Sequence, residues 1–218
     1  MNQDQMKPLN RFFVFIYYLV GLIADILHPV TVEGLEHLPK SGALLCPNHS
    51  SNWDPILVAL KLPVNYRLHI MAKEELFRNP VLGWILRKVG AFPVNRGGSD
   101  IQSVKTALQA IKSGDNLLMF PEGTRCNGDK HVRTKTGAVR IAAAAGAPVV
   151  PIFVTRNKTP FCPIDVIVGR PREVACTADA PHERMQEEAD EILRTIYKMG
   201  GDSYADHIGE NSGVLLRG

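Results

Sequence analysis

The chain alternates short apolar runs with segments whose apolar residues recur at helical spacing. Six of the apolar runs are bounded by Pro, Gly or Asn, which is typical of strands. They cover residues 43–46, 68–71, 91–94, 116–120, 149–154 and 165–168. Because helical patterns separate these runs, the sequence predicts an α/β fold with a layered mixed sheet flanked by helices.

The expected helices cover residues 55–62, 99–113, 137–145 and 181–199. Asp54 is a candidate N-cap of the first helix, and Pro55 suits the first helical position. Ser99 begins a capping-box pattern with Gln102, and Gly114 is placed to end that second helix. The fourth helix carries its apolar residues on one face, as an amphipathic helix does.

The first 29 residues contain a long apolar run in which residues 12–24 carry no charge. As a helix, residues 12–27 would extend about 24 Å, which is shorter than the ~30 Å hydrocarbon core of a bilayer. Three interpretations stay open: a helix in the membrane interface, a marginal transmembrane helix and a buried core helix. Tyr17 and Tyr18 favour the headgroup boundary, so we expect a membrane-associated N-terminal helix.

Composition excludes several classes of protein. The 218 residues are 45% hydrophobic and 22% charged, which is typical of a folded globular protein rather than a disordered, collagen-like or coiled-coil chain. The four cysteines form no CxxC pair and are too scattered for a disulfide scaffold. A structural zinc site is therefore not expected.

Charge is unevenly distributed along the chain. Residues 61–140 contain 14 Lys and Arg against 6 Asp and Glu, whereas the remainder contains 11 against 16. This basic block suits an anionic partner such as a phosphate, a nucleotide, a nucleic acid or an anionic lipid surface. A solvated basic face is the alternative.

The segment from Asn48 to Asp54 carries the first chemical pattern. His49 follows an expected strand, and the loop after it can fold the Asp54 carboxylate back onto imidazole Nδ1. That contact would leave Nε2 as a proton acceptor, as a general base requires. A structural histidine beside a helix cap is the alternative. Ser50 and Ser51 lack the GxSxG setting of a nucleophile, so we favour direct proton abstraction from a substrate hydroxyl.

A second group follows the expected strand 116–120, at the strand end where open α/β sheets bind ligands. Glu122 can accept hydrogen bonds from hydroxyl groups, and Arg125 can grip phosphate oxygens in bidentate fashion. Gly123 permits close approach of a ligand or another backbone. A structural turn with a surface ion pair is the alternative.

Two further cations end expected strands. Arg96 precedes a capped helix N-terminus, which is a favourable position for a phosphate. Lys73 follows the strand 68–71 and can face the same edge of the sheet. Each is a weak signal alone, and a solvated lysine is the simpler interpretation of Lys73.

Taken in order, four segments resemble the motifs of the glycerolipid acyltransferase family, and in particular its bacterial 1-acylglycerol-3-phosphate acyltransferases. Residues 48–54 (NHSSNWD) resemble the NHxxxxD motif, and residues 120–125 (FPEGTR) resemble the third motif. Residues 90–96 and 150–152 are similar to the second and fourth motifs. The resemblance covers about residues 30–168.

The resemblance implies transfer of a fatty acyl group from acyl-CoA or acyl carrier protein to the sn-2 hydroxyl of lysophosphatidic acid, forming phosphatidic acid. It implies that His49 is the general base and that Asp54 orients it. It implies acceptor or phosphate binding by Lys73, Arg96, Glu122, Gly123, Thr124 and Arg125. No metal or organic cofactor is expected.

The resemblance also implies work at the cytoplasmic face of a membrane. We therefore expect residues 1–29 to form a membrane-anchoring helix, residues 30–200 an acyltransferase domain and residues 201–218 a polar tail. Two other enzymes remain open: an acyltransferase for glycerol 3-phosphate or another lysolipid, and a thioesterase or other hydrolase. A non-catalytic binding module is a third possibility, although the sequence has no nucleic-acid-binding motif and we expect no nucleic-acid partner.

Overall fold

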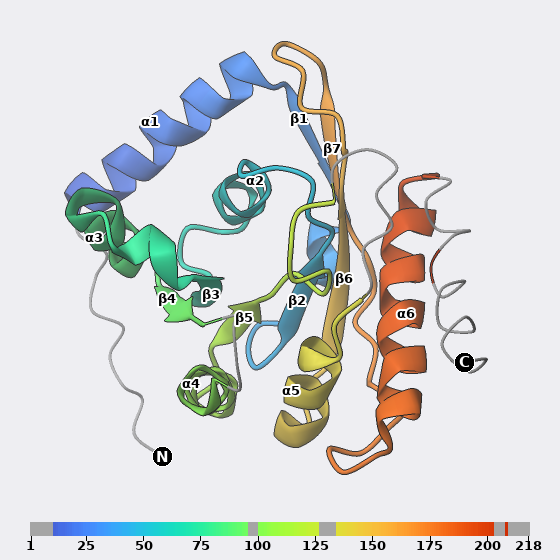
Figure 1. Cartoon of the computed structure of the whole chain (residues 1–218). Coiled ribbons are helices and arrows are strands. Elements are labelled where there is room, and N and C mark those ends of the chain that lie inside the picture. The colour runs from blue at the N-terminus through green and yellow to red at the C-terminus, as the bar shows by residue number, and fades with distance from the viewer. Residues whose placement is uncertain (1–10, 96–99, 127–133, 203–207, 209–218) are drawn as a thin grey trace.

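A computed structural model of the chain describes residues 11–95, 100–126, 134–202 and 208 (Figure 1). Its centre is a sheet with the strand order β1-β7-β6-β2-β5-β3-β4. All neighbouring strands are parallel except β6 and β7, so the sheet is mixed. The strands are β1 (Val30–Glu33), β2 (Leu44–Pro47), β3 (Leu68–Lys73), β4 (Ala91–Val94), β5 (Asn116–Leu118), β6 (Val149–Val154) and β7 (Ile164–Val168).

Helices cover both faces of this sheet. Figure 1 shows α1 and α2 on one side of the sheet, and α5 and α6 on the other. The helices are α1 (Arg11–Leu27), α2 (Asp54–Lys61), α3 (Pro80–Lys88), α4 (Ile101–Lys112), α5 (Gly137–Ala145) and α6 (His182–Met199). Short 3₁₀ helices span Leu35–His37 and Glu74–Phe77.

The buried side chains divide into two apolar layers, one on each face of the sheet. In β2, Leu44 and Cys46 pack in the layer with α4, α5 and α6, whereas Leu45 packs in the layer with α2. This alternation follows from the period of two along a strand. All strands from β2 to β7 had been expected from their apolar runs, and the layered mixed sheet is confirmed.

One strand and one α-helix were not expected from the sequence. β1 is only four residues long and alternates half-buried with exposed positions, so its apolar signal is weak. α3 exposes Val81, Trp84 and Ile85, although they are large apolar residues. Its N-cap is Asn79, whose side chain accepts hydrogen bonds from the amides of the next turn.

Two expected helix caps were wrong. Asp54 is the first residue of α2 rather than its N-cap, which is Trp53. The Asp54 carboxylate instead accepts hydrogen bonds from the preceding loop. The N-cap of α4 is Asp100, whose carboxylate accepts the Ser103 amide at 2.9 Å, and the expected cap Ser99 lies outside the described residues.

Two polar side chains of α1 bind it to α2. The Tyr17 hydroxyl lies 3.0 Å from the Ala59 carbonyl oxygen and 2.8 Å from that of Leu62, at the end of α2. Lys61 and Asp25 form an ion pair with an N–O distance of 2.5 Å. A buried core helix is nevertheless the wrong interpretation, because described apolar side chains of α1 such as Phe15 and Ile26 are exposed.

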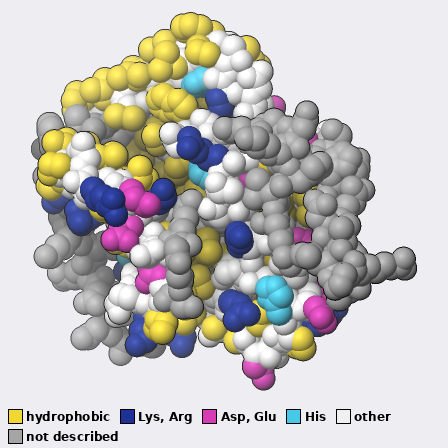
Figure 2. Space-filling model, in the orientation of Figure 1, with side chains coloured by type: hydrophobic (Ala, Val, Ile, Leu, Met, Phe, Trp, Pro, Cys, Tyr) yellow, Lys and Arg dark blue, Asp and Glu magenta, His cyan; other side chains and the backbone are white. Residues whose placement is uncertain are grey.

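The outward face of α1 exposes Phe15, Tyr18, Leu22, Ile23 and Ile26. Figure 2 shows hydrophobic side chains along α1 at the top of the molecule and again over α3 at the left. Within the described residues, no helix combines the length and apolar character needed to cross a bilayer. The expected division into residues 1–29, 30–200 and 201–218 stays a prediction, because most of the last segment lies outside the described residues.

Candidate active site

The polar groups of the site follow the ends of three adjacent strands. β2 lies between β6 and β5, and all three run parallel. Their carboxyl ends therefore share one edge of the sheet, as ligand-binding edges do in open α/β folds. β2 leads to His49, β5 leads to Glu122, and β6 leads to the segment that carries Lys158.

The predicted contact between His49 and Asp54 is present. Imidazole Nδ1 lies 3.0 Å from Asp54 Oδ2. Asp54 is fully buried and His49 is nearly so. The same Oδ2 accepts the backbone amides of Ser50 at 2.6 Å and Ser51 at 2.7 Å, so the loop between the two residues wraps around the carboxylate.

These contacts keep Asp54 charged. Burial opposes ionisation, but hydrogen bonds from His49 and Ser51 and the charge of Lys158 outweigh it and lower the pKa of Asp54. Lys158 Nζ lies 3.0 Å from Asp54 Oδ1. A charged Asp54 fixes the protonated nitrogen of a neutral imidazole at Nδ1 and leaves Nε2 as the acceptor.

Neighbouring side chains hold the His49 loop on the sheet. The Asn48 side chain extends the pairing of β2 with β6. Its Oδ1 accepts the Val154 N–H at 2.7 Å, and its Nδ2 donates to the Val154 carbonyl at 2.9 Å. The His49 ring stacks on Phe120, with ring centroids 4.1 Å apart. The Cys126 amide donates to the His49 carbonyl at 2.7 Å. Backbone and ring plane of His49 are therefore both fixed before substrate arrives.

Glu122 is fully buried, and both of its oxygens are occupied. Oε2 accepts the His49 backbone N–H at 3.1 Å, and Oε1 accepts the Tyr197 hydroxyl at 2.6 Å. Burial raises the pKa of Glu122 to about 8, although these two donors oppose the rise. Glu122 thus holds the histidine loop against α6, and its expected role in acceptor binding stays a prediction.

The rest of this turn leads to the surface. Gly123 has a φ of 65°, in the left-handed region that favours glycine, and its amide donates to the Phe120 carbonyl at 3.0 Å. Thr124 and Arg125 follow it and are exposed. Arg125 therefore stands at the same sheet edge as His49, with its guanidinium accessible to a ligand.

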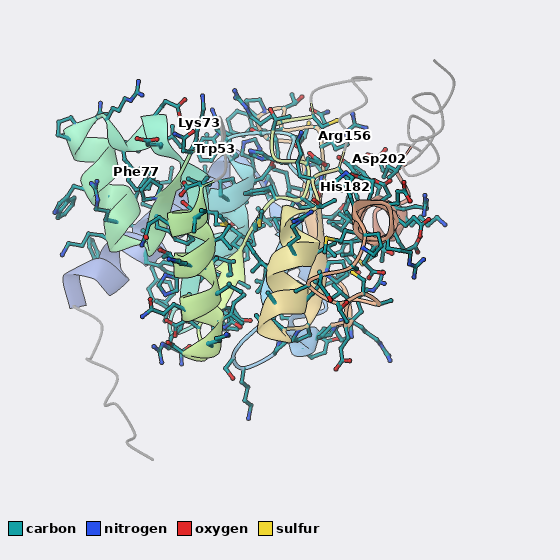
Figure 3. All side chains as sticks on the ribbon, turned by 60° about the horizontal axis from the view of Figure 1, so that its bottom comes forward. Trp53, Lys73, Phe77, Arg156, His182 and Asp202 are labelled. Atoms are coloured by element: carbon teal, nitrogen blue, oxygen red, sulfur yellow. The ribbon has the colours of Figure 1, made fainter. Side chains whose placement is uncertain are left out.

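Lys73 ends β3 and lies at this edge as well. Its Nζ pairs with Glu75 Oε1 at 3.0 Å, and both side chains are about half exposed. Figure 3 shows Lys73 and Trp53 on the same side of the molecule, and Arg156 with Asp202 beside α6. Arg96 lies outside the described residues.

Comparison with known proteins decides the family. A family model described as Acyltransferase matches residues 29–155, which is more than half of the chain. The chain belongs to the acyltransferase family. The matched region includes the His49 loop, Glu122 and the adjoining strands, and the expected enzyme class is confirmed.

Relatives and a solved structure support this acyltransferase assignment. The chain is 41% identical over 140 residues to the 1-acyl-sn-glycerol-3-phosphate acyltransferase of Bacillus subtilis, covering 64% of this chain and 69% of that protein. It is 31% identical over 144 residues to a lyso-ornithine lipid O-acyltransferase of Pseudomonas aeruginosa, covering 65% and 53%.

The crystal structure of the 1-acyl-sn-glycerophosphate (LPA) acyltransferase PlsC from Thermotoga maritima has the same fold. Its TM-score against this chain is 0.67, at 21% sequence identity, with 90% of this chain and 84% of that chain covered. At this identity the likeness concerns the fold of the acyltransferase.

Three residues of this acyltransferase site escaped the sequence interpretation. Phe120 stood inside a recognised motif but gave no sign of stacking on His49. Lys158 and Tyr197 lie far from the motifs in sequence, and reach Asp54 and Glu122 through the fold. Tyr197 lies among the buried apolar residues of α6, where a single hydroxyl carries no signal of its own.

The described part of the acyltransferase contains no group of three or more His, Cys, Asp or Glu side chains that could hold a metal ion. The expectation of a reaction without a metal or organic cofactor stays a prediction.

Proposed function

We propose that this acyltransferase transfers a fatty acyl group from acyl-CoA or acyl carrier protein to the sn-2 hydroxyl of lysophosphatidic acid, forming phosphatidic acid. The observation that carries the proposal is the 3.0 Å contact between His49 Nδ1 and the buried carboxylate of Asp54. The names of the relatives from Bacillus subtilis and Streptococcus pneumoniae, both 1-acyl-sn-glycerol-3-phosphate acyltransferases, support the choice of acceptor.

In this mechanism His49 Nε2 takes the proton of the acceptor hydroxyl as its oxygen attacks the thioester carbonyl. Asp54 stabilises the imidazolium that forms. Collapse of the tetrahedral intermediate breaks the C–S bond, and the departing thiolate takes the proton from His49. General base catalysis of this kind contributes about 10²- to 10⁴-fold.

The acceptor is an anion, and the sheet edge supplies cations for it. Arg125 is exposed next to the buried Glu122, and Lys73 ends β3 at the same edge. A guanidinium can bind two phosphate oxygens at once, whereas an ammonium acts as a point charge. Arg125 therefore binds the acceptor phosphate, and Lys73 and Arg96 add positive charge.

In this proposal the enzyme works at the cytoplasmic face of an anionic phospholipid membrane, the surface that holds a lysolipid acceptor. Support comes from the outward apolar face of α1 and from the exposed Val81 and Trp84 of α3. Both ribbon views draw α3 near the N-terminal end of α1. Lys88 lies over the Trp84 ring at 5.7 Å, which joins a cation to an amphipathic ring as at membrane interfaces.

The test is an acyl-transfer assay with labelled acyl-CoA and acyl carrier protein thioesters and identified products. We expect lysophosphatidic acid to be acylated, and His49→Ala to lower turnover at least about a hundredfold. His182→Ala is the matched control, because His182 is exposed at the start of α6. Near-normal turnover by a folded His49→Ala variant would overturn the mechanism.

A second acceptor is favoured by one observation, the 31% identity to a lyso-ornithine lipid O-acyltransferase. The assay therefore includes lyso-ornithine lipid and glycerol 3-phosphate beside lysophosphatidic acid. Preference for either one would replace the proposed acceptor and keep the base. Thiol release at full rate without any acceptor would indicate a thioesterase instead.

A further inference from the structure

Lys158 is a buried cation that has no role in the mechanism proposed above. Its side chain is 7% exposed. The residue belongs to the loop that connects β6 to β7, outside the region that the family model matches. Its ammonium group contacts Asp54 Oδ1 at 3.0 Å, Ser50 Oγ at 3.3 Å and the Thr155 carbonyl oxygen. These three acceptors use all three N–H donors of a charged lysine.

The segment around Lys158 is fastened on both sides. The Thr155 amide donates to the Asp165 carbonyl at 3.0 Å, and the Asp165 amide donates to Thr155 Oγ1 at 2.9 Å. Further along, the Phe161 amide donates to the Leu27 carbonyl at 2.6 Å, and Phe161 has a φ of 66°. This non-glycine residue in the left-handed region indicates that tertiary contacts fix the loop.

The two oxygens of Asp54 therefore have different partners. Oδ2 receives His49 Nδ1 and two backbone amides, and Oδ1 receives Lys158. The carboxyl group of Glu122 accepts the His49 backbone N–H from the opposite side. A positive charge on the far oxygen weakens the pull of Asp54 on an imidazolium and repels the imidazolium directly.

We propose that Lys158 is a positioning residue that partly neutralises Asp54 and so keeps the His49 imidazole unprotonated, and ready to act as a base, down to lower pH. The inference rests on the proposed role of His49. It assigns to Lys158 an electrostatic task that a purely structural lysine would not have. Burial lowers the pKa of Lys158, and the adjacent Asp54 opposes that effect. The three oxygen acceptors around its ammonium group match the three donors of a charged lysine.

The test is the pH dependence of kcat/KM for Lys158→Met, which preserves an unbranched buried side chain and removes the charge. We expect the acidic limb of the profile to move to higher pH by about one unit or more, which is the scale on which a single neighbouring charge acts. Activity on the acidic limb then falls by up to about tenfold for each unit of that move, and returns as the pH is raised. Lys158→Arg keeps the charge and holds the limb within a few tenths of a unit of wild type.

Arg172→Met is the matched control, because it removes a cation from an ion pair with Glu188, with an N–O distance of 2.6 Å, away from His49. Its profile should superimpose on that of wild type. An NMR titration of the His49 ring in wild type and Lys158→Met gives a second measurement that does not depend on turnover. If Lys158→Met is too unstable to assay, the same titration is made on Lys158→Gln.

Three outcomes separate the inference from the proposed function. The inference about Lys158 is supported if the acidic limb of the kcat/KM profile and the titration of the His49 ring both move to higher pH in Lys158→Met. Loss of activity that no pH restores, with an unmoved ring titration, overturns it while the His49 mechanism stands. Full activity of His49→Ala overturns the proposed function itself, whatever Lys158 does.

Discussion

Replacement of Glu122 by Gln should change how the stability of this protein depends on pH. Glu122 is fully buried, and burial raises its pKa to about 8 from an ordinary value of 4.5, against hydrogen bonds from Tyr197 and the His49 amide. At neutral pH the folded protein therefore holds this carboxyl neutral, whereas the unfolded chain ionises it.

The sign follows from proton counting. Between about pH 4.5 and pH 8 the folded state binds one proton more than the unfolded state at this residue, so the free energy of unfolding falls as the pH rises. The slope is about 1.4 kcal/mol per pH unit. Over the range from pH 4.5 to pH 8, the free energy of unfolding therefore falls by at most ~5 kcal/mol because of this residue. The contribution is complete below the unfolded pKa and lost above the folded one. Glu122→Gln carries no charge at any pH and lacks this slope.

The assay is urea unfolding at fixed detergent concentration, followed by fluorescence of Trp53 and Trp84, from pH 4 to pH 9. Subtracting the unfolding free energy of Glu122→Gln from that of wild type cancels the contributions of the other titrating groups. This wild-type-minus-variant difference should fall by several kcal/mol between pH 4.5 and pH 8. Glu33→Gln, at an exposed position of β1, is the matched control and should not reproduce this fall.

A flat difference for Glu122→Gln would refute the reasoning, because it would mean that the carboxyl titrates alike in both states. A difference that rises with pH would refute it more directly. It would show that the two donors outweigh burial and that Glu122 is held as a carboxylate.

Three further perturbations test other parts of the site. Arg125→Ala should raise the acceptor KM about tenfold or more with a smaller effect on kcat, whereas Arg140→Ala, at another exposed arginine, should leave both unchanged. Unchanged acceptor kinetics in Arg125→Ala would remove the phosphate-binding role. Gly123→Ala should destabilise the protein by about 1–2 kcal/mol in thermal unfolding, because its φ of 65° is costly for any residue with a Cβ; an unchanged Tm would contradict this. The double variant Leu22→Ser/Ile26→Ser should sediment less with anionic phospholipid vesicles than wild type, whereas Ile101→Ser, at a similarly exposed residue of α4, should not. Equal sedimentation of the two variants would argue against α1 as the membrane-binding face.

Local patterns were enough for a large part of the fold. The apolar runs found β2 to β7 within about two residues at each end, because a buried strand needs a continuous apolar segment whatever its neighbours are. Gly114 marked the end of α4 through its left-handed backbone conformation, a property of one residue. By contrast, α3 was not found, since its apolar residues do not enter the core and so follow no core-facing period.

The candidate site divides in the same way. The pair of His49 and Asp54 lies within six residues, so its contact is a short-range property of one loop, and the sequence predicted it. Its surroundings are long-range: Tyr197 is 75 residues from Glu122, and Lys158 contacts Ser50 across 108 residues. Such partners become neighbours only because the sheet places β2 between β5 and β6 and packs α6 against β6. The sequence determined the pairing of His49 with Asp54, and the tertiary structure decided which charges surround that pair, because strand order brings together groups that no local pattern connects.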